Sequence, residues 1–297
     1  MSDTAVEERG RWRAEVGLGV MVTIWGVNFA VVKWALDAFE PLGFNALRHV
    51  LVSLFMAAVL YFRGRLTRPA RRDMPRIVVL GIVGTVTYQM LFIFGLDRAR
   101  AGNASLMLAL VPLFLLVFGG RSAERSAINW IGALLSVLGI ALVSGSSLQL
   151  EGPETLVGDL ILIGAAAVWA IYTLGARPLI AVYGPIRTTA WTLWAGSVVL
   201  ILAGIPSLLH QDWTVVGPAA WGGLFYSAIF SIGVAYLLWY RGVQQIGGAR
   251  TAVFSNLTPV VAVGAGAFWL GERLTWLTLT GAVLVIGGVL LVRPRPT

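Results

Sequence analysis

The sequence contains no cysteine, a single lysine and few charged residues of either sign, which together make up 12% of the chain. The absence of cysteine excludes disulfides and thiolate metal sites. The single lysine, Lys33, lies in "VVKWA" and not in a Gly-Lys-Ser/Thr string, so the chain has no Walker A loop. ATP-driven chemistry is therefore excluded for this polypeptide.

Motifs of hydrolytic enzymes are also missing from the sequence. It has no H-E-x-x-H, no G-x-S-x-G and no cluster of Asp and His. We therefore expect neither an enzyme nor a bound cofactor or metal. The net charge of +8 would favour a nucleic-acid partner in a soluble protein. Here the positive charge is explained by the topology of the loops between membrane spans. No nucleic-acid partner is therefore expected.

Apolar residues dominate what is present, at 58% of the chain with a mean hydropathy of +0.82. Ten apolar stretches approach the roughly 20 residues that a helix needs to cross a bilayer. The sequence therefore predicts an all-α integral membrane protein with ten transmembrane helices. The predicted spans are Val16 to Leu36, Leu42 to Phe62, Ile77 to Leu96, Ala101 to Gly120, Ala127 to Ser144, Leu156 to Ala176, Arg187 to Leu209, Ala219 to Tyr240, Ala249 to Leu270 and Leu274 to Val292.

Positive charge in the loops predicts the orientation of these spans. Arginine is concentrated on the amino-terminal side, including six residues in "RGRLTRPARRDMPR", whereas the opposite loops hold only Arg98, Arg100 and Arg273. The positive-inside rule then places both termini in the cytoplasm. The expected location is the bacterial inner membrane, crossed many times, with the lipid bilayer as the immediate partner.

An internal repeat divides the spans into two groups of five. "GLDRARAGNASLMLALVPLF" aligns without a gap on "GVQQIGGARTAVFSNLTPVV", and Trp25 and Lys33 match Trp169 and Arg177 at an offset of 144 residues. Since five is odd, the second copy must run in the opposite direction, as in inverted-repeat transporters. The expected division is a cytoplasmic tail (1–15), a first repeat (16–144), an external linker (145–155), a second repeat (156–292) and a cytoplasmic tail (293–297).

Three features of the chain resemble a known family. They are the two five-helix halves, the Pro and Arg of "EPLGFNALRHV", and "LTPVVAVGAGAFWLGERLTW" near the end. Together they resemble the EamA branch of the drug/metabolite transporter superfamily, and most of all the YddG-type exporters of aromatic and other neutral amino acids. In the first half only Glu124 and Arg125 match the Gly-Glu-Arg-Leu-Thr string. The resemblance implies export by alternating access around a central cavity between the repeats.

Candidate substrate-binding residues lie on two matching spans. Trp25 and Asn28 share one face of the first span, and Trp169 and Tyr172 take the matching positions on the sixth. In an inverted repeat these faces meet near mid-membrane, where an amide and aromatic rings suit a ligand with a polar end and an apolar side chain. Alternatively, Asn28 bonds a neighbouring helix.

Further candidates lie on the second, third and eighth spans. An arginine at the depth of Arg48 is expected to face the bundle interior, where it could attract a carboxylate or fix a backbone carbonyl. His49 could relay a proton or serve as a hydrogen-bonded structural residue. Additional residues expected to line the cavity are Tyr88, Gln89, Tyr236 and Tyr240.

Other residues are expected to act as scaffold. Pro112 and Pro259 interrupt helical hydrogen bonding, so each is either a hinge or a fixed kink. Glycines at seven-residue intervals on the fifth and tenth spans predict that these two helices pack together. Lys33 lies near the external end, where its ammonium group is expected to reach the interface. Glu15 and Asp159 are assigned to span ends, so no carboxylate is expected inside a span.

The function expected from these observations is secondary export of small metabolites, above all aromatic or neutral amino acids. A monomer is expected to suffice. The alternatives are export of other small neutral metabolites or drugs, or a non-transporting membrane sensor or scaffold.

Overall fold

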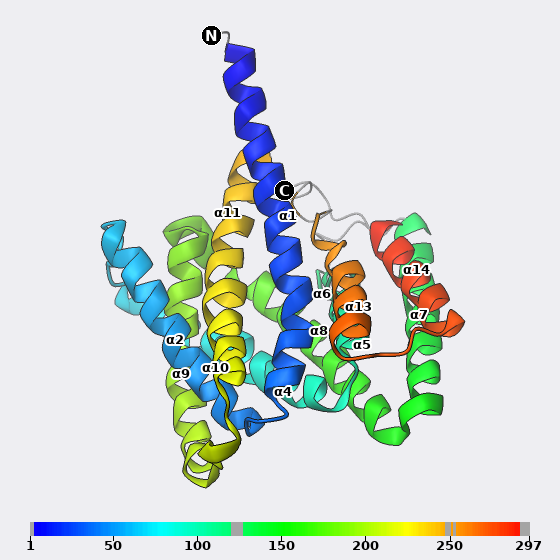
Figure 1. The fold of residues 1–297 in the computed structure, drawn as a ribbon. Coiled ribbons are helices and arrows are strands. Elements are labelled where there is room, and N and C mark those ends of the chain that lie inside the picture. The colour runs from blue at the N-terminus through cyan, green and yellow to red at the C-terminus, as the bar shows by residue number, and fades with distance from the viewer. Residues whose placement is uncertain (1–2, 120–126, 247–250, 252–253, 292–297) are drawn as a thin grey trace.

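The computed structural model describes residues 3–119, 127–246, 251 and 254–291, and all regular structure in these ranges is helical (Figure 1). The prediction of an all-helical protein is confirmed for this part of the chain. Glu124, Arg125 and the ends of three predicted spans, at Gly120, Ala249 and Val292, lie outside the described residues.

Eight of the predicted spans are helices long and apolar enough to cross a membrane. The ninth and tenth correspond to shorter apolar helices, α13 and α14. The helices are α1 (Asp3–Ala35), α2 (Pro41–Phe62), α3 (Met74–Gly81), α4 (Tyr88–Arg98), α5 (Ala101–Leu108), α6 (Val111–Phe118), α7 (Ala127–Glu151), α8 (Pro153–Tyr183), α9 (Pro185–His210), α10 (Pro218–Phe225), α11 (Ala235–Ile246), α13 (Thr258–Trp269) and α14 (Trp276–Leu291).

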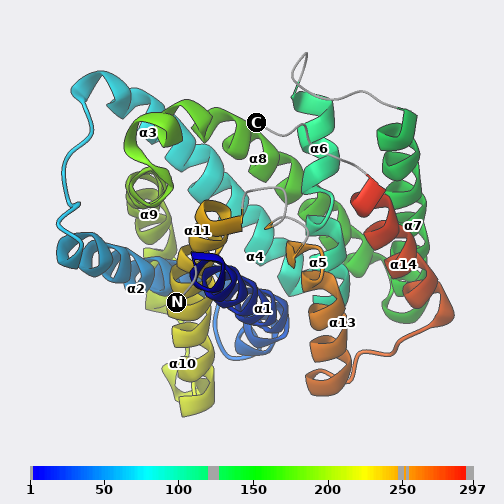
Figure 2. The same cartoon turned by 90° about the horizontal axis from the view of Figure 1, so that it is seen from above.

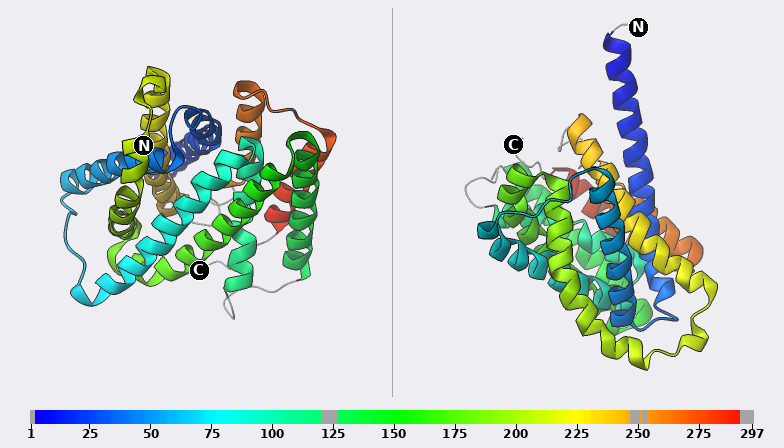
Figure 3. Two further views of the ribbon diagram at one scale, coloured as in Figure 1. Left: turned by 90° about the horizontal axis from the view of Figure 1, so that it is seen from below. Right: turned by 90° about the vertical axis from the view of Figure 1, so that its left-hand side faces the viewer.

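Proline and glycine in the sequence determine where several of these helices begin. Prolines open α2, α8, α9 and α10, where the missing N–H would have no partner in any case. Gly152 and Gly184 precede two of these prolines with φ of 87° and 75°, values that favour glycine. Because α7 continues to Glu151, the turn between the two halves is confined to Gly152. At the N-terminal end of the chain, the first turns of α1 extend past the other helices (Figure 3).

Two long helices each contain a π-helical segment. The first, η2 (Ile82–Thr87), joins α3 to α4, and the second, η5 (Tyr226–Val234), joins α10 to α11. They begin 144 residues apart, the same offset that relates Trp25 to Trp169. Such segments disturb the regular i to i−4 bonding and are frequent at functional sites.

The two mid-span prolines end one helix and begin another. Pro112 stands at the start of α6 after a break at Ala109 and Leu110, and Pro259 stands at the start of α13 after a break at Asn256 and Leu257. The predicted interruption is therefore present at both prolines, as a break in the helix. Their role as hinges stays a prediction.

Each half of the chain packs mainly against the other half. α1 contacts α11 and α13, and correspondingly α8 contacts α4 and the α5–α6 pair. α2 contacts η5, whereas α9 contacts α3 and η2. The remaining large contacts join α2 to α9 and α7 to α14, and the last pair forms one edge of the molecule (Figures 1 and 2).

The packing of α7 against α14 depends on glycine, as the sequence predicts. A Cβ atom on Gly139 would lie 2.6 Å from the carbonyl oxygen of Gly281, and one on Gly288 would overlap the carbonyl oxygen of Gly132. Ser136 donates a hydrogen bond of 2.9 Å to the Gly132 carbonyl of its own helix. Because the obstructing atoms belong to the backbone, the helices cannot yield locally to a larger residue.

Two neighbouring glycines provide a matched test of this interface. Gly288→Ala should lower the melting temperature in detergent, because the added methyl group forces the helices apart. Gly287→Ala adds the same methyl group in the same helix but meets no atom of the described residues within 4 Å. It should therefore leave the melting temperature unchanged or raise it through helix propensity. Equal melting temperatures of the two variants would contradict this interpretation.

Candidate functional site

Five of the predicted site residues form a continuous cluster of rings at the centre of the bundle. Trp25 of α1 contacts Tyr236 of α11, which contacts Trp169 of α8, with ring centroids 5.8 and 6.3 Å apart. Trp169 also contacts Tyr88 of α4 and Tyr172 of its own helix, at 4.8 and 5.2 Å. We call these five residues the aromatic cluster. Each keeps accessible surface, so the rings can contact a ligand.

Hydrogen bonds fix the orientation of two of these rings. The Trp25 indole donates a bond of 3.0 Å to the carbonyl of Ser231, which belongs to the π-helical segment η5. The Tyr172 hydroxyl pairs with that of Thr192 at 3.0 Å. A side chain on Gly84, in η2, would overlap the Tyr172 ring. Both π-helical segments therefore lie directly against the aromatic cluster.

Arg48 is a buried cation beside the aromatic cluster. It is 2% exposed, and one terminal nitrogen, Nη2, donates a bond of 2.5 Å to the side-chain oxygen of Gln89. The rings of Phe92 and Phe44 lie 5.5 and 5.9 Å from the guanidinium carbon. Nε and Nη1 have no hydrogen-bond partner among the described residues. Buried donors without partners are costly, so this group is suited to receive an anion.

Asn28 and His49 each have one buried polar atom, Oδ1 and Nε2, that makes no hydrogen bond within the described part of the chain. Asn28 is 6% exposed, and its Oδ1 atom accepts no hydrogen bond within the described part of the chain. A helix-joining role predicts such a bond, so its absence at this atom favours ligand binding. His49 is fully buried, and its Nδ1 atom pairs with the carbonyl oxygen of Asn45 at 2.8 Å. That bond fits a structural histidine.

Lys33 has a role that the sequence did not predict. Its ammonium group donates bonds of 3.2 and 3.0 Å to the carbonyl oxygens of Leu96 and Asp97, in the last turn of α4. A cation at this position satisfies carbonyls that lack helical partners and opposes the helix dipole. Lys33 therefore joins α1 to the end of α4, and its reach to the interface stays a prediction.

Glu272, the glutamate of the Gly-Glu-Arg-Leu-Thr string, also binds a helix end. Its carboxylate accepts bonds of 2.5 and 3.1 Å from the backbone N–H groups of Ala101 and Gly102, at the start of α5. Arg100 donates a bond of 2.7 Å to the carbonyl of Arg273. Because these partners are about 170 residues apart in sequence, local patterns could not reveal the contact.

Asp159 contradicts the expectation that no carboxylate lies inside a span. It is fully buried and lies within the span Pro153–Tyr183. The carboxylate accepts bonds from the Ser144 hydroxyl at 2.7 Å and the Asn103 amide at 3.4 Å. The position predicted for Asp159, at the end of a span, was wrong because α8 begins at Pro153 and not at Leu156. Asp159 thus joins α8 to α5 and α7.

Comparisons with known proteins agree with this architecture. The model of the EamA-like transporter family matches residues 13–145 and 156–293. A "probable terminal-alkyne amino-acid exporter" of Streptantibioticus cattleyicolor is 28% identical, covering 95% of this chain and 94% of its own. The "uncharacterized transporter YyaM" of Bacillus subtilis is also 28% identical, covering 89% and 88%. One solved structure matches with a TM-score of 0.66 and 20% identity over 95% of this chain and 96% of that one, a likeness of fold alone.

The buried carboxylate can be tested for a structural role. Asp159→Asn keeps an oxygen acceptor for Ser144 but cannot ionise, so transport and its pH profile should match the wild type. Asp159→Leu removes the acceptor of the Ser144 and Asn103 bonds, which should cost roughly 1–3 kcal/mol each and lower the melting temperature. A pH dependence of transport that disappears in Asp159→Asn would instead identify Asp159 as a proton carrier.

Proposed function

This chain belongs to the EamA-like transporter family, and from that membership we propose that it exports neutral amino acids with apolar side chains, above all aromatic ones. It is a multi-pass membrane transporter of small molecules and not an enzyme. The proposal adds the substrate class, the direction of transport and the residues that bind the substrate.

Arg48 is the single observation that supports this substrate class most directly. Its guanidinium group has two nitrogens without partners in the described part of the chain, and the Phe92 ring beside it stacks on Tyr88 of the aromatic cluster. A substrate carboxylate would pair with these nitrogens through charge-assisted hydrogen bonds. The Oδ1 atom of Asn28 is a suitable acceptor for the substrate ammonium group.

The aromatic cluster supports the apolar part of the same proposal. Five rings with accessible surface offer stacking and edge contacts to an aromatic or aliphatic side chain. The relative from Streptantibioticus cattleyicolor, named as a probable exporter of a terminal-alkyne amino acid, adds support for amino acids as substrates. Other small neutral metabolites remain the alternative substrates.

We propose alternating access between two inverted repeats, residues 16–144 and 156–292, as the mechanism. Three observations support it: the exchange of packing partners between the halves, the π-helical segments 144 residues apart, and the helix breaks at Pro112 and Pro259. In this proposal α13 and α14 complete ten crossings, both termini are cytoplasmic, the two prolines act as hinges, and a monomer suffices.

Two variants separate substrate binding from structural roles. Asn28→Ala removes an acceptor for the substrate, a loss on the order of 1 kcal/mol or more. Trp169→Ala removes a ring whose stacking contributes roughly 0.5 to 1.5 kcal/mol. Transport in proteoliposomes should fall several-fold in both variants, and Trp169→Ala should impair phenylalanine more than threonine.

The control is Trp276→Ala, which removes an 85% exposed tryptophan outside the aromatic cluster and should leave selectivity unchanged. Melting temperatures should be measured on the same preparations. A lower melting temperature with unaltered selectivity in both variants would remove Asn28 and Trp169 from the proposed site.

A further inference from the structure

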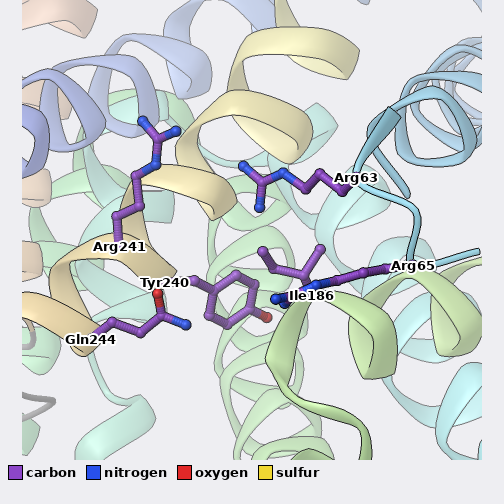
Figure 4. A pocket seen from close by; sticks show the side chains of 6 residues that line it. All are labelled: Arg63, Arg65, Ile186, Tyr240, Arg241 and Gln244. Carbon is purple, nitrogen blue, oxygen red and sulfur yellow. The ribbon is translucent and has the colours of Figure 1, made fainter. Parts of the chain in front are cut away.

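A second polar site lies at the end of the bundle where α2 and α11 finish and α9 begins. It is a pocket of about 380 Å³ lined by Arg63, Arg65, Ile186, Tyr240, Arg241 and Gln244 (Figure 4). We call it the arginine pocket. Arg63 and Arg65 reach into it from the chain that follows α2, opposite Tyr240 and Gln244 of α11.

The charge of the arginine pocket is positive and not neutralised by its lining. Among the described residues that line it, three are arginines and none is acidic. The side chains of these three arginines make no hydrogen bond or ion pair within the described part of the chain. Ile186 belongs to the first turn of α9, a 26-residue helix whose N-terminal dipole adds positive potential. An anionic group in the pocket would relieve the repulsion among these charges.

Tyr240 separates the arginine pocket from the aromatic cluster. Its hydroxyl group forms a hydrogen bond with the hydroxyl of Thr189, one turn into α9. Its ring lies 6.3 Å from the ring of Tyr236, a member of the aromatic cluster. A ligand in the pocket is therefore one aromatic side chain away from the proposed substrate site.

The opposite ends of α2 and α9 are closed. The backbone N–H of Gly43 bonds the Ser207 hydroxyl at 3.0 Å, and that of Glu40 bonds the Gln211 side chain at 2.8 Å. A Cβ atom on Gly204 would lie 2.9 Å from the carbonyl oxygen of Leu42. The same two helices also pack at mid-length, where the Trp194 indole donates a bond of 3.1 Å to the Ser53 carbonyl, and Leu60 and Ala190 share one apolar cluster. The arginine pocket lies at the remaining end of the pair, which we call the near side.

We propose that the arginine pocket is a recruitment site that binds the carboxylate of a transported molecule before it passes Tyr240 to Arg48. The ligand class is a small organic carboxylate, including the zwitterionic amino acids. This inference rests on the proposed function, because it assigns the first step of the same transport path. Arg63 and Arg241 attract the anion at the near face, and Tyr240 with Thr189 forms the barrier that follows.

The test compares Arg63→Gln/Arg241→Gln with wild type in proteoliposomes, using phenylalanine and its amide, which lacks the carboxylate. For phenylalanine supplied from the near side, the double variant should raise KM roughly threefold to tenfold at low salt, with kcat unchanged. For phenylalanine supplied from the far side, and for the amide from either side, KM should not change. Arg72→Gln, which removes an exposed charge outside the pocket, is the matched control.

Each outcome has a distinct meaning. An unchanged near-side KM in a protein that transports phenylalanine would overturn the recruitment site and leave the proposed function intact. If wild type transports no amino acid, the proposed function itself fails. The last comparison repeats the same assay, with wild type and the double variant, in vesicles without anionic lipid. If the effect of the double variant disappears there, the pocket binds a lipid phosphate, and the carboxylate assignment is overturned.

Discussion

The site depends on one buried charge, the guanidinium group of Arg48, whose only hydrogen bond within the described chain is to the neutral side chain of Gln89. Burial of a cation without a counter-ion is costly. Two phenylalanine rings and one amide offset part of that cost. A ligand carboxylate would supply the missing partner, so binding energy and selectivity would arise from the same group.

Close backbone packing between the two halves of the chain holds the helices of the bundle together. Gly84 leaves room for Tyr172, Gly196 lies against the Gly81 carbonyl, and α7 meets α14 through glycines. Lys33 and Glu272 bind helix ends across the bundle. The α2–α9 pair packs at its far end and at mid-length, where Trp194 donates a bond to the Ser53 carbonyl, and it borders the arginine pocket at its near end. We expect the mobile part of the proposed cycle at that near end.

Much of the candidate site could be predicted from the sequence because the repeat places matching residues on matching helices. The offset of 144 residues brought Trp25 and Trp169 together as candidates, and both contact Tyr236. The arginine pocket escaped prediction since positive charge in such loops already had an explanation in membrane topology. The burial of Asp159 and the bonds of Glu272 depend on tertiary contacts that hydropathy and spacing do not encode.

The measurement that tests the central claim most directly is equilibrium binding of phenylalanine and its amide to wild type and Arg48→Gln. A charge-assisted hydrogen bond is worth roughly 1.5–3 kcal/mol, so the variant should bind phenylalanine at least about tenfold more weakly. The amide should bind both proteins equally, which also shows that the variant is folded. Equal affinity of the two proteins for phenylalanine would contradict a carboxylate held by Arg48.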